Sequence, residues 1–323
     1  MPDSKSFKPD LRIFGCGVLM GAADIVPGVS GGTVALVLGI YHRLVTAISH
    51  VDATALRLLS QRRFKDAADH IDLRFLVALG LGIGSGIGGL AFLMHYLLEH
   101  QLQYTFAVFS GLILGSGILV GRSIPVWNGL TILSAVAGVV FAWFVVGLES
   151  LQHPPDTYWY LFLCGTVGIC AMILPGISGS FILLILGRYD DVTGLVRSML
   201  KGDLSPETLI AVAVFGAGCV GGLLAFSRVL RWLLGRHTAV TLATLCGFML
   251  GSLRKIWPFK LDLTPDETKF KLKQFENQLP ATLDGETVLT IALALLALTA
   301  VVSLEFISRR RRKSEQTAAQ PTV

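Results

Sequence analysis

The sequence has 323 residues, of which 53% are hydrophobic and only 15% are charged. Its mean hydropathy is +0.66. These values exclude a soluble enzyme and a disordered chain, and they indicate an all-α membrane protein with several spans. The net charge of +5 lies mainly in connecting segments and in the C-terminal tail, where basic residues indicate orientation. No basic face with interleaved aromatic residues occurs, so we expect no nucleic-acid partner.

The chain opens with a polar segment, residues 1–10, that we expect to lie in the cytosol without a cleaved signal peptide. An apolar half follows at 11–26, a break at 27–33 (PGVSGGT), and a second apolar half at 34–41. Neither half reaches the ~20 residues that a membrane span needs. We expect a broken, re-entrant helix pair, and the alternative is one continuous, kinked span.

Residues 42–74 are polar and basic, with apolar residues spaced as in amphipathic helices at the cytosolic surface. Three ordinary spans are predicted next, at 75–98, 104–121 and 129–148. Small residues four apart let helices approach closely. We therefore expect two glycine packing seams, one formed by Gly80, Gly84 and Gly88 and the other by Gly111 and Gly115.

A linker at 149–156 separates this first membrane repeat, 11–148, from a second repeat at 157–308. The second repeat contains another Pro-Gly-x-Ser-Gly break, 148 residues after the first (175 − 27 = 148). Spans are predicted at 209–234, 239–253 and 288–307, with a loop at 254–285 and a basic tail at 309–323. Two further markers recur in the same order, GLILGS at Gly111 with GFMLGS at Gly247, and the glycine pair Gly88–Gly89 with Gly221–Gly222. Together these markers predict an internal duplication.

The distribution of Lys and Arg predicts the topology. Segment 42–74 and the tail are basic, whereas segments 99–103 and 149–156 contain no Lys or Arg. If each broken pair returns to its own side, each repeat makes three full crossings and the two repeats are inverted relative to each other. Both termini are then cytosolic, and loop 254–285 is extracytoplasmic. Continuous kinked spans would instead give parallel repeats.

The two breaks carry the chemistry of an anion site. Their glycines let the backbone approach a ligand, and the N–H groups and dipole at the start of the following helix attract phosphate or carboxylate. A duplicated broken helix is typical of a transporter's binding site. The expected substrate-binding residues in the breaks are Gly28, Ser30, Gly31, Gly32, Thr33, Gly176, Ser178, Gly179 and Ser180, with Pro27 and Pro175 as hinges. The alternative is that proline and glycine only kink two spans.

Two charged residues are candidates for further roles. Asp24 lies beside the first break, and Met172 occupies the matching position in the second copy. An intramembrane carboxylate beside an anion site suggests coupling to H⁺ or Na⁺, and the alternative is a structural cap. Arg228 is the basic residue lying deepest within a predicted span, and we expect it to assist substrate binding. We find no metal-ligand spacing, nucleophile elbow or Walker loop, and therefore expect neither a metal, a cofactor nor an enzyme.

The motifs GAADIVPGVSGGTVALVLGIYHRLV, ILPGISGSFILLILGRY and GFMLGSLRKIWP resemble the polyprenyl-phosphate transporter family of bacterial inner-membrane proteins, over about residues 11–308. The resemblance implies return of undecaprenyl phosphate across the inner membrane, so that the lipid carrier is reused in peptidoglycan and envelope synthesis. Its partners would be that lipid and the surrounding membrane lipids. The second motif lacks the aspartate and reads Gly-Ser where the first reads Gly-Gly, so the two half-sites should differ.

Two other functions remain open at this stage. One is a channel or exchanger for a small anion that uses the same helix ends in a water-filled pore. The other is a membrane enzyme acting on a lipid phosphate, which the lack of an evident nucleophile disfavours. The protein could also form a homo-oligomer, which the sequence does not decide.

Overall fold

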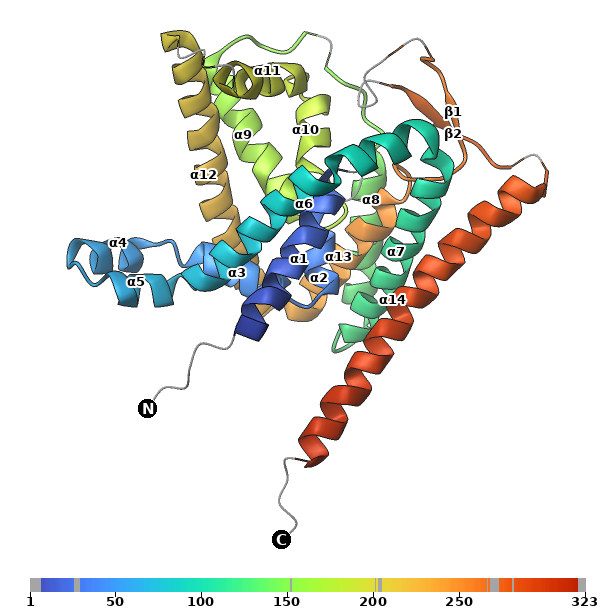
Figure 1. The fold of residues 1–323 in the computed structure, drawn as a ribbon, viewed down its shortest axis with the longest axis horizontal. Coiled ribbons are helices and arrows are strands. Elements are labelled where there is room, and N and C mark those ends of the chain that lie inside the picture. The colour runs from blue at the N-terminus through green and yellow to red at the C-terminus, as the bar shows by residue number, and fades with distance from the viewer. Residues whose placement is uncertain are drawn as a thin grey trace. The chain divides into compact units, whose positions relative to one another are not determined.

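The structure is a computed structural model that describes residues 7–25, 30–151, 153–200, 202, 205–265, 267, 273–280 and 282–318. These residues are largely helical (Figure 1). The helices of the first half are α1 (Phe7–Ile25), α2 (Gly31–Val37), α3 (Tyr41–Ser49), α4 (Ala53–Ser60), α5 (Phe64–His70), α6 (Leu73–His100), α7 (Leu102–Ser123) and α8 (Gly129–Val145). Those of the second half are α9 (Tyr158–Ile173), α10 (Gly179–Ile185), α11 (Tyr189–Leu200), α12 (Pro206–Arg236), α13 (Thr238–Ser252) and α14 (Gly285–Ala318).

Four helices are long and apolar enough to cross a membrane, which supports the predicted multi-pass protein. Their qualifying segments are Leu73–Leu90, Leu102–Ser123, Pro206–Arg236 and Gly285–Ser303. The predicted spans at 129–148 and 239–253 correspond to shorter apolar helices, α8 and α13, of 17 and 15 residues. The bent pair α2 and α3 also qualifies when the two helices are taken together.

Local sequence explains where several helices begin and end. Gly39 and Gly187, 148 residues apart (187 − 39 = 148), have φ values of +72° and +70°. This left-handed conformation suits glycine and stops α2 and α10 after two turns. The apolar segment predicted at 34–41 is therefore divided at Gly39. Helices α2 and α3, on either side of the division, are bent by 118° relative to each other. The Asn128 side chain caps α8, and that of Ser205 caps α12 with Pro206 directly after it.

The loop predicted at 254–285 contains the described strands β1 (Lys260–Asp262) and β2 (Phe275–Asn277), which pair antiparallel. The all-α prediction is therefore wrong for this short hairpin. Lys260 lies opposite Asn277, and the Lys260 amine donates to the Asn277 side-chain oxygen at 2.7 Å. Lys273 and Asp262 form an ion pair of 2.6 Å that also joins the two strands' segments.

Packing divides the chain into two compact units, Met1–His95 with Ile124–Lys255, and Tyr96–Ser123 with Ile256–Val323. The first unit holds both helix breaks. Its buried core is centred on α2 and α3, whose Ala35, Tyr41 and Val45 are at most 2% exposed. Side chains of α1, α6, α12 and α13 surround them. The short helices after the first break are thus enclosed by the longer ones.

The two halves repeat the same contact between a broken helix and a long helix. In the first half, Gly82 and Gly86 of α6 abut the backbone carbonyls of Phe14 and Val18 of α1. In the second half, Gly218 and Gly222 of α12 abut those of Phe162 and Thr166 of α9. The α1 and α9 residues are 148 apart (162 − 14 = 148), and the α6 and α12 glycines are 136 apart (218 − 82 = 136). The duplication is therefore present in the packing as well as in the sequence.

This packing corrects two predictions about α6. An added Cβ at Gly80, Gly84 or Gly88 would meet no atom within 4 Å, so the predicted seam is on the wrong side of the helix. The seam is formed by Gly82 and Gly86, shifted by two residues. The predicted pairing of Gly88–Gly89 with Gly221–Gly222 has an offset of 133 residues (221 − 88 = 133). The observed contacts have an offset of 136, so this predicted pairing is wrong by three residues.

The remaining glycine seams join helices from opposite halves. Gly247 of α13 abuts the carbonyl of Ala135 in α8, within the first unit. Gly111 of α7 abuts the carbonyl of Ala294 in α14, within the second unit. The predicted seam at Gly111 and Gly115 is confirmed, and Gly115 lies against Leu298. In both helix pairs, α8–α13 and α7–α14, one helix therefore comes from the first half of the chain and the other from the second half.

We expect Gly247→Ala to destabilise the protein, because the added methyl overlaps the backbone oxygen of Ala135. Overpacking of this kind costs about 1–3 kcal/mol. Gly80→Ala is the matched control, since Gly80 is a helical glycine with open space around its Cα. Denaturant titration in a mild detergent measures both variants. Equal free energies of unfolding for the two variants would contradict the seam.

Candidate functional site

The first break lies between α1 and α2, and Ser30 organises its described part. Ser30 is 1% exposed and has extended backbone angles, with φ −127° and ψ 138°. Its hydroxyl oxygen accepts the Gly32 N–H at 3.1 Å, which is the usual N-cap bond. Pro27 and Gly28, a predicted hinge and a predicted binding residue, lie outside the described residues.

Asp24 reaches from the last turn of α1 to the start of α2. Its Oδ1 accepts the Gly31 N–H at 2.7 Å, and its carboxylate lies directly against the Gly31 Cα. A side chain at Gly31 would overlap the carboxylate oxygens. Asp24 thus takes the position that an external anion would take, and a carboxylate at a helix N-terminus is electrostatically favoured there. In this structure Asp24 caps the start of α2, which is the structural alternative considered for it, and binding of an external anion there stays a prediction.

The second break lies between α9 and α10 and differs from the first. Pro175 is fully buried, and Gly176 has φ +85° with its Cα packed on the backbone of Phe248. Ser178 is the N-cap residue of α10 but makes no side-chain capping bond. Its hydroxyl instead lies 2.9 Å from that of Ser180. The expected inequality of the two half-sites is therefore visible in their hydrogen bonds.

The two breaks interlock through hydroxyl groups. The Ser30 hydroxyl lies 3.2 Å from the Met172 carbonyl oxygen and 3.3 Å from that of Leu174, and the Tyr41 hydroxyl donates to the Ile173 carbonyl at 3.2 Å. At the C-terminal end of α9 the last carbonyls have no partner in a following turn of helix, although that of Leu174 also accepts the Ile177 N–H at 3.4 Å. In the opposite direction, the Gly176 N–H donates to the hydroxyl of Thr33 at 2.8 Å. The contacts of Ser30, Thr33 and Gly176 therefore join the two breaks, with the start of α2 against the end of α9.

The contact leaves no room for larger residues. A side chain at Gly32 would overlap the Ile173 carbonyl oxygen, and one at Gly179 would approach the Gly168 carbonyl oxygen at 2.6 Å. The positive end of α2 thus faces the negative end of α9, which is a favourable arrangement of helix dipoles. The donors of the first break are consequently occupied in this structure, Gly31 by Asp24 and Gly32 by Ser30.

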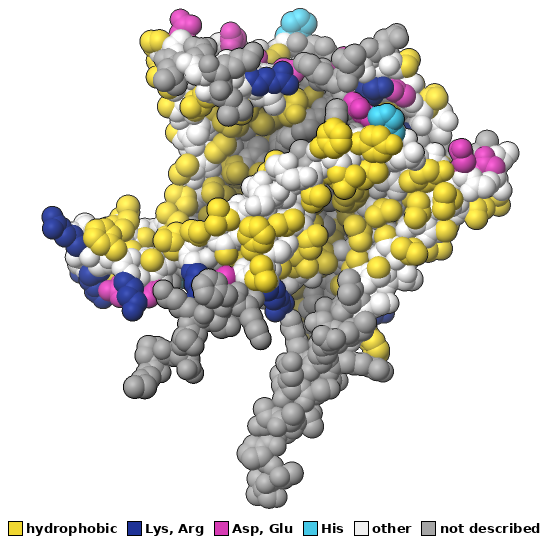
Figure 2. All heavy atoms as spheres, viewed as in Figure 1, with side chains coloured by type: hydrophobic (Ala, Val, Ile, Leu, Met, Phe, Trp, Pro, Cys, Tyr) yellow, Lys and Arg dark blue, Asp and Glu magenta, His cyan; other side chains and the backbone are white. Residues whose placement is uncertain are grey.

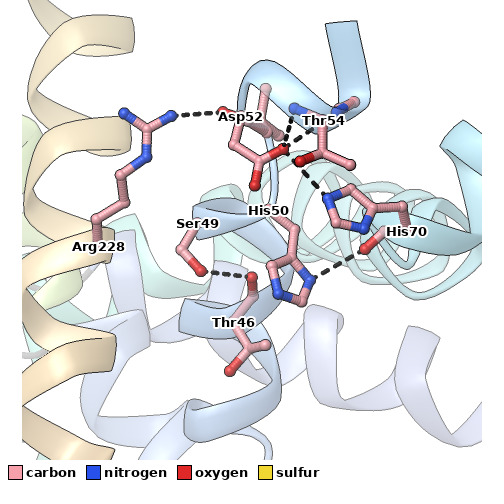
Figure 3. A network of polar contacts seen from close by, with 9 residues as sticks. Thr46, Ser49, His50, Asp52, Thr54, His70 and Arg228 are labelled. Atoms are coloured by element: carbon pink, nitrogen blue, oxygen red, sulfur yellow. Dashed lines mark hydrogen bonds and ion pairs between the residues drawn. The ribbon is translucent and has the colours of Figure 1, made fainter. Parts of the chain in front are cut away.

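Arg228, a predicted substrate ligand, points elsewhere in this structure. Its guanidinium is exposed and donates to the Val51 carbonyl at 2.8 Å, which joins α12 to the segment before α4 (Figure 3). Its predicted contact with a substrate remains a prediction. The neighbouring polar network of His50, Asp52 and His70 lies on the α3–α5 side of this contact (Figure 3).

Sequence reasoning missed two residues that the structure places beside the breaks. Tyr41 caps α9, and its pairing with Tyr189, 148 residues apart (189 − 41 = 148), was the available signal. Lys255 follows α13, and its amine lies 4.1 Å from the ring centroid of Phe181, in the first turn of α10. Among the described residues, no carboxylate forms an ion pair with Lys255. It is thus a cation near the second break.

Within the described parts of the chain, no group of three or more His, Cys, Asp or Glu side chains is placed to hold a metal ion. The five cysteines lie in helices α1, α9, α12 and α13 and form no disulfide. The polar groups at the breaks are hydroxyls, backbone groups and one carboxylate. Of these groups, the hydroxyls and backbone N–H groups can donate to an anion, whereas the carboxylate of Asp24 accepts.

We expect Ser30→Ala to lower the free energy of unfolding by about 2 kcal/mol, because it removes an N-cap bond and the hydroxyl donor to the Met172 carbonyl. Ser178→Ala is the matched control in the second copy and should cost at most about 1 kcal/mol, since it loses one hydroxyl–hydroxyl bond. Denaturant titration of both variants in the same detergent is the measurement. A larger loss for Ser178→Ala would contradict the assigned interlock.

Comparisons with known proteins cover the part of the chain that holds both breaks. A family model described as undecaprenyl phosphate translocase-like matches residues 20–272, which include both breaks. A polyprenyl-phosphate transporter of Vibrio cholerae is 38% identical over 90% of this chain and 94% of its own length. A polyprenyl-phosphate transporter of Staphylococcus aureus is 31% identical over 75% of this chain and 84% of its own. No solved structure matches. The chain belongs to the undecaprenyl phosphate translocase-like family.

Proposed function

We propose that this protein moves a polyprenyl phosphate, most specifically undecaprenyl phosphate, across the bacterial inner membrane. In this role it returns the lipid carrier for envelope synthesis. The relatives' names support the substrate class. The proposal rests on the observation that the Asp24 carboxylate accepts the Gly31 N–H at the start of α2. A phosphate head group is the same kind of acceptor, and the isoprenoid tail can stay in lipid while the head crosses.

The proposed binding step is an exchange of anions at the first break. Two negative groups repel each other when they share one set of donors. A phosphate therefore binds beside Gly31 when Asp24 has released that N–H and carries no charge, either by taking up a proton or by pairing with Na⁺. Binding of the head group is in this way coupled to a cation at Asp24. The Ser30 and Thr33 hydroxyls and the Gly32 N–H lie in the same break and are occupied by the interlock in this structure, and we propose that they donate to the phosphate once the interlock opens.

The proposed role of the second break is to complete the head-group site. Ser178 and Ser180 offer hydroxyls that are not used as caps, and Gly176 and Gly179 keep the backbone close. Lys255, near α10, supplies a positive charge for the phosphate. Charge-assisted hydrogen bonds to phosphate oxygens are the stronger kind. We therefore add Lys255 to the predicted residues Ser178 and Ser180.

The proposed architecture is a pair of inverted repeats with both termini in the cytosol. The helix seams support a two-fold relation, because α7 of the first half packs on α14 of the second, and α13 of the second packs on α8 of the first. The contacts correspond residue by residue, with Ala135 and Ala294 in equivalent places on α8 and α14. Reciprocal pairs of this kind arise in inverted and in parallel repeats, and the distribution of Lys and Arg favours the inverted arrangement. Transport then alternates access to the breaks from the two leaflets.

We expect purified protein in liposomes to move a labelled polyprenyl phosphate between leaflets, faster when a pH or Na⁺ gradient is imposed. Asp24→Asn keeps an acceptor for Gly31 but removes the charge, so the variant should transfer lipid at a rate that no longer responds to the gradient. Asp10→Asn is the matched control, because Asp10 lies on the same helix and pairs with Arg74. Loss of outer-leaflet label reports the rate.

The same liposomes distinguish the alternatives. Flux of inorganic phosphate without lipid transfer would favour the small-anion transporter. Release of phosphate from the lipid would identify an enzyme. A gradient response that Asp24→Asn retains would remove Asp24 from the coupling step and leave lipid transfer itself intact.

A further inference from the structure

A helical arm projects from the first half and has no equivalent of the same length in the second. It consists of α4 and α5 and is called the arm below. The residue offset between the halves is 148 before this region and 136 after it, so the first half contains twelve additional residues here (148 − 136 = 12). The arm is thus a feature of one repeat only. Its side chains are not used by the proposed transport site.

The arm is held in a fixed direction by polar contacts at its base (Figure 3). The Asp52 carboxylate accepts two backbone N–H groups in the first turn of α4 at 2.9 and 3.0 Å, and lies 3.2 Å from the His70 ring at the end of α5. The His50 ring stacks on that of His70, 4.8 Å between centroids, and contacts its carbonyl at 3.0 Å. Arg228 of α12 binds the Val51 carbonyl. The orientation of the arm is therefore built into the fold.

The arm presents large apolar side chains outward. Ala55 and Ala67 are buried, 5% and 3% exposed. Leu56, Leu59 and Phe64, in contrast, are 67%, 46% and 64% exposed. Figure 2 shows hydrophobic side chains gathered over one side of the arm, at the left of the view. Exposed apolar groups held in a fixed direction indicate a surface that binds something apolar.

Basic residues border this apolar surface. The exposed ones are Arg57, Arg62, Arg63 and Lys65, at the end of α4, in the turn and at the start of α5. Figure 2 shows Lys and Arg side chains at the tip and lower edge of the arm, beside the apolar side. Arg63 also pairs with Asp66 at 2.7 Å. Apolar residues on one face and basic residues around them are typical of helices that lie in the headgroup layer of a membrane.

The apolar surface continues from the arm onto a predicted membrane span. Leu73, Val77 and Leu81 follow one another at four-residue spacing on α6 and are 41%, 50% and 62% exposed. With Ala68 of α5 they line an open groove of about 480 Å³ that also includes the Arg74–Asp10 ion pair. α6 carries a segment apolar enough to cross a membrane, so this groove runs from the arm toward lipid.

We propose that the arm lies flat in the lipid headgroup layer and binds anionic phospholipid. Its apolar side enters the acyl region, and its Arg and Lys side chains bind the phosphates. Neither helix is long enough to cross a membrane, since α4 has 8 residues and α5 has 7. Anionic headgroups match the surplus of positive charge, and an apolar face continuous with α6 matches the acyl chains. The inference is independent of which anion the protein transports.

The test uses full-length protein in vesicles of phosphatidylcholine, alone or mixed with phosphatidylglycerol. The five native cysteines are replaced by alanine, and single cysteines at Leu56→Cys or Phe64→Cys carry an environment-sensitive NBD label. Thr54→Cys is the matched control, because Thr54 is exposed on α4, two residues and so about half a turn from Leu56. Emission wavelength and quenching by brominated lipid report depth. Circular dichroism and gel filtration confirm that each variant is folded.

We expect a blue shift and loss of emission with brominated lipid for labels at positions 56 and 64, and neither for the label at 54. The effect should be stronger with phosphatidylglycerol. Combined replacement of Arg57, Arg62, Arg63 and Lys65 by Gln should abolish the difference between the two vesicle types. Labels at 56 and 64 that remain in water in both vesicle types would overturn the proposal. Equal insertion with and without phosphatidylglycerol would overturn its anionic-lipid part.

Discussion

The capping of α9 by hydroxyls from the other repeat is the interaction on which the candidate site depends. A helix that ends inside an apolar core leaves carbonyl oxygens that must find donors. Here Ser30 and Tyr41, from the segments flanking α2, provide them. The cap fixes α2 against α9, and this places Asp24 against the first N–H of α2. The position of the carboxylate is thus a consequence of the fold of both halves.

Glycine seams supply the other constraint. Each long helix approaches its partner so closely that the seam glycines touch backbone oxygens, as Gly82 does at Phe14 and Gly218 at Phe162. In lipid, helices associate through such packing because hydrocarbon offers no hydrophobic driving force between them. The same seam in both halves gives two similar pairs of broken helices. Differences between these two pairs, such as Asp24 in the first and Met172 in the second, are therefore candidates for function.

The sequence was sufficient for the duplication, the two breaks and most of the spans, because Pro-Gly-x-Ser-Gly recurs in full and long apolar runs are easy to recognise. It was insufficient for the seam on α6. That helix carries glycines at alternate positions from 80 to 88. Spacing alone cannot decide which of two faces is packed, and the observed face belongs to Gly82 and Gly86. The interlock was also out of reach in detail, since Ser30 and its acceptors are 142 and 144 residues apart.

The capping of α9 by Ser30 and Tyr41 has a mechanical consequence. Moving α2 away from α9 would leave the carbonyls of Met172 and Ile173 without the Ser30 and Tyr41 hydroxyls in apolar surroundings. Unpaired buried carbonyls cost on the order of 1–3 kcal/mol each. The breaks therefore stay closed until water, lipid headgroups or a substrate provides replacement partners. In the proposed transport cycle, this cost would keep the breaks closed until a ligand or one leaflet's polar layer reaches them, which would limit leakage of small ions between cycles.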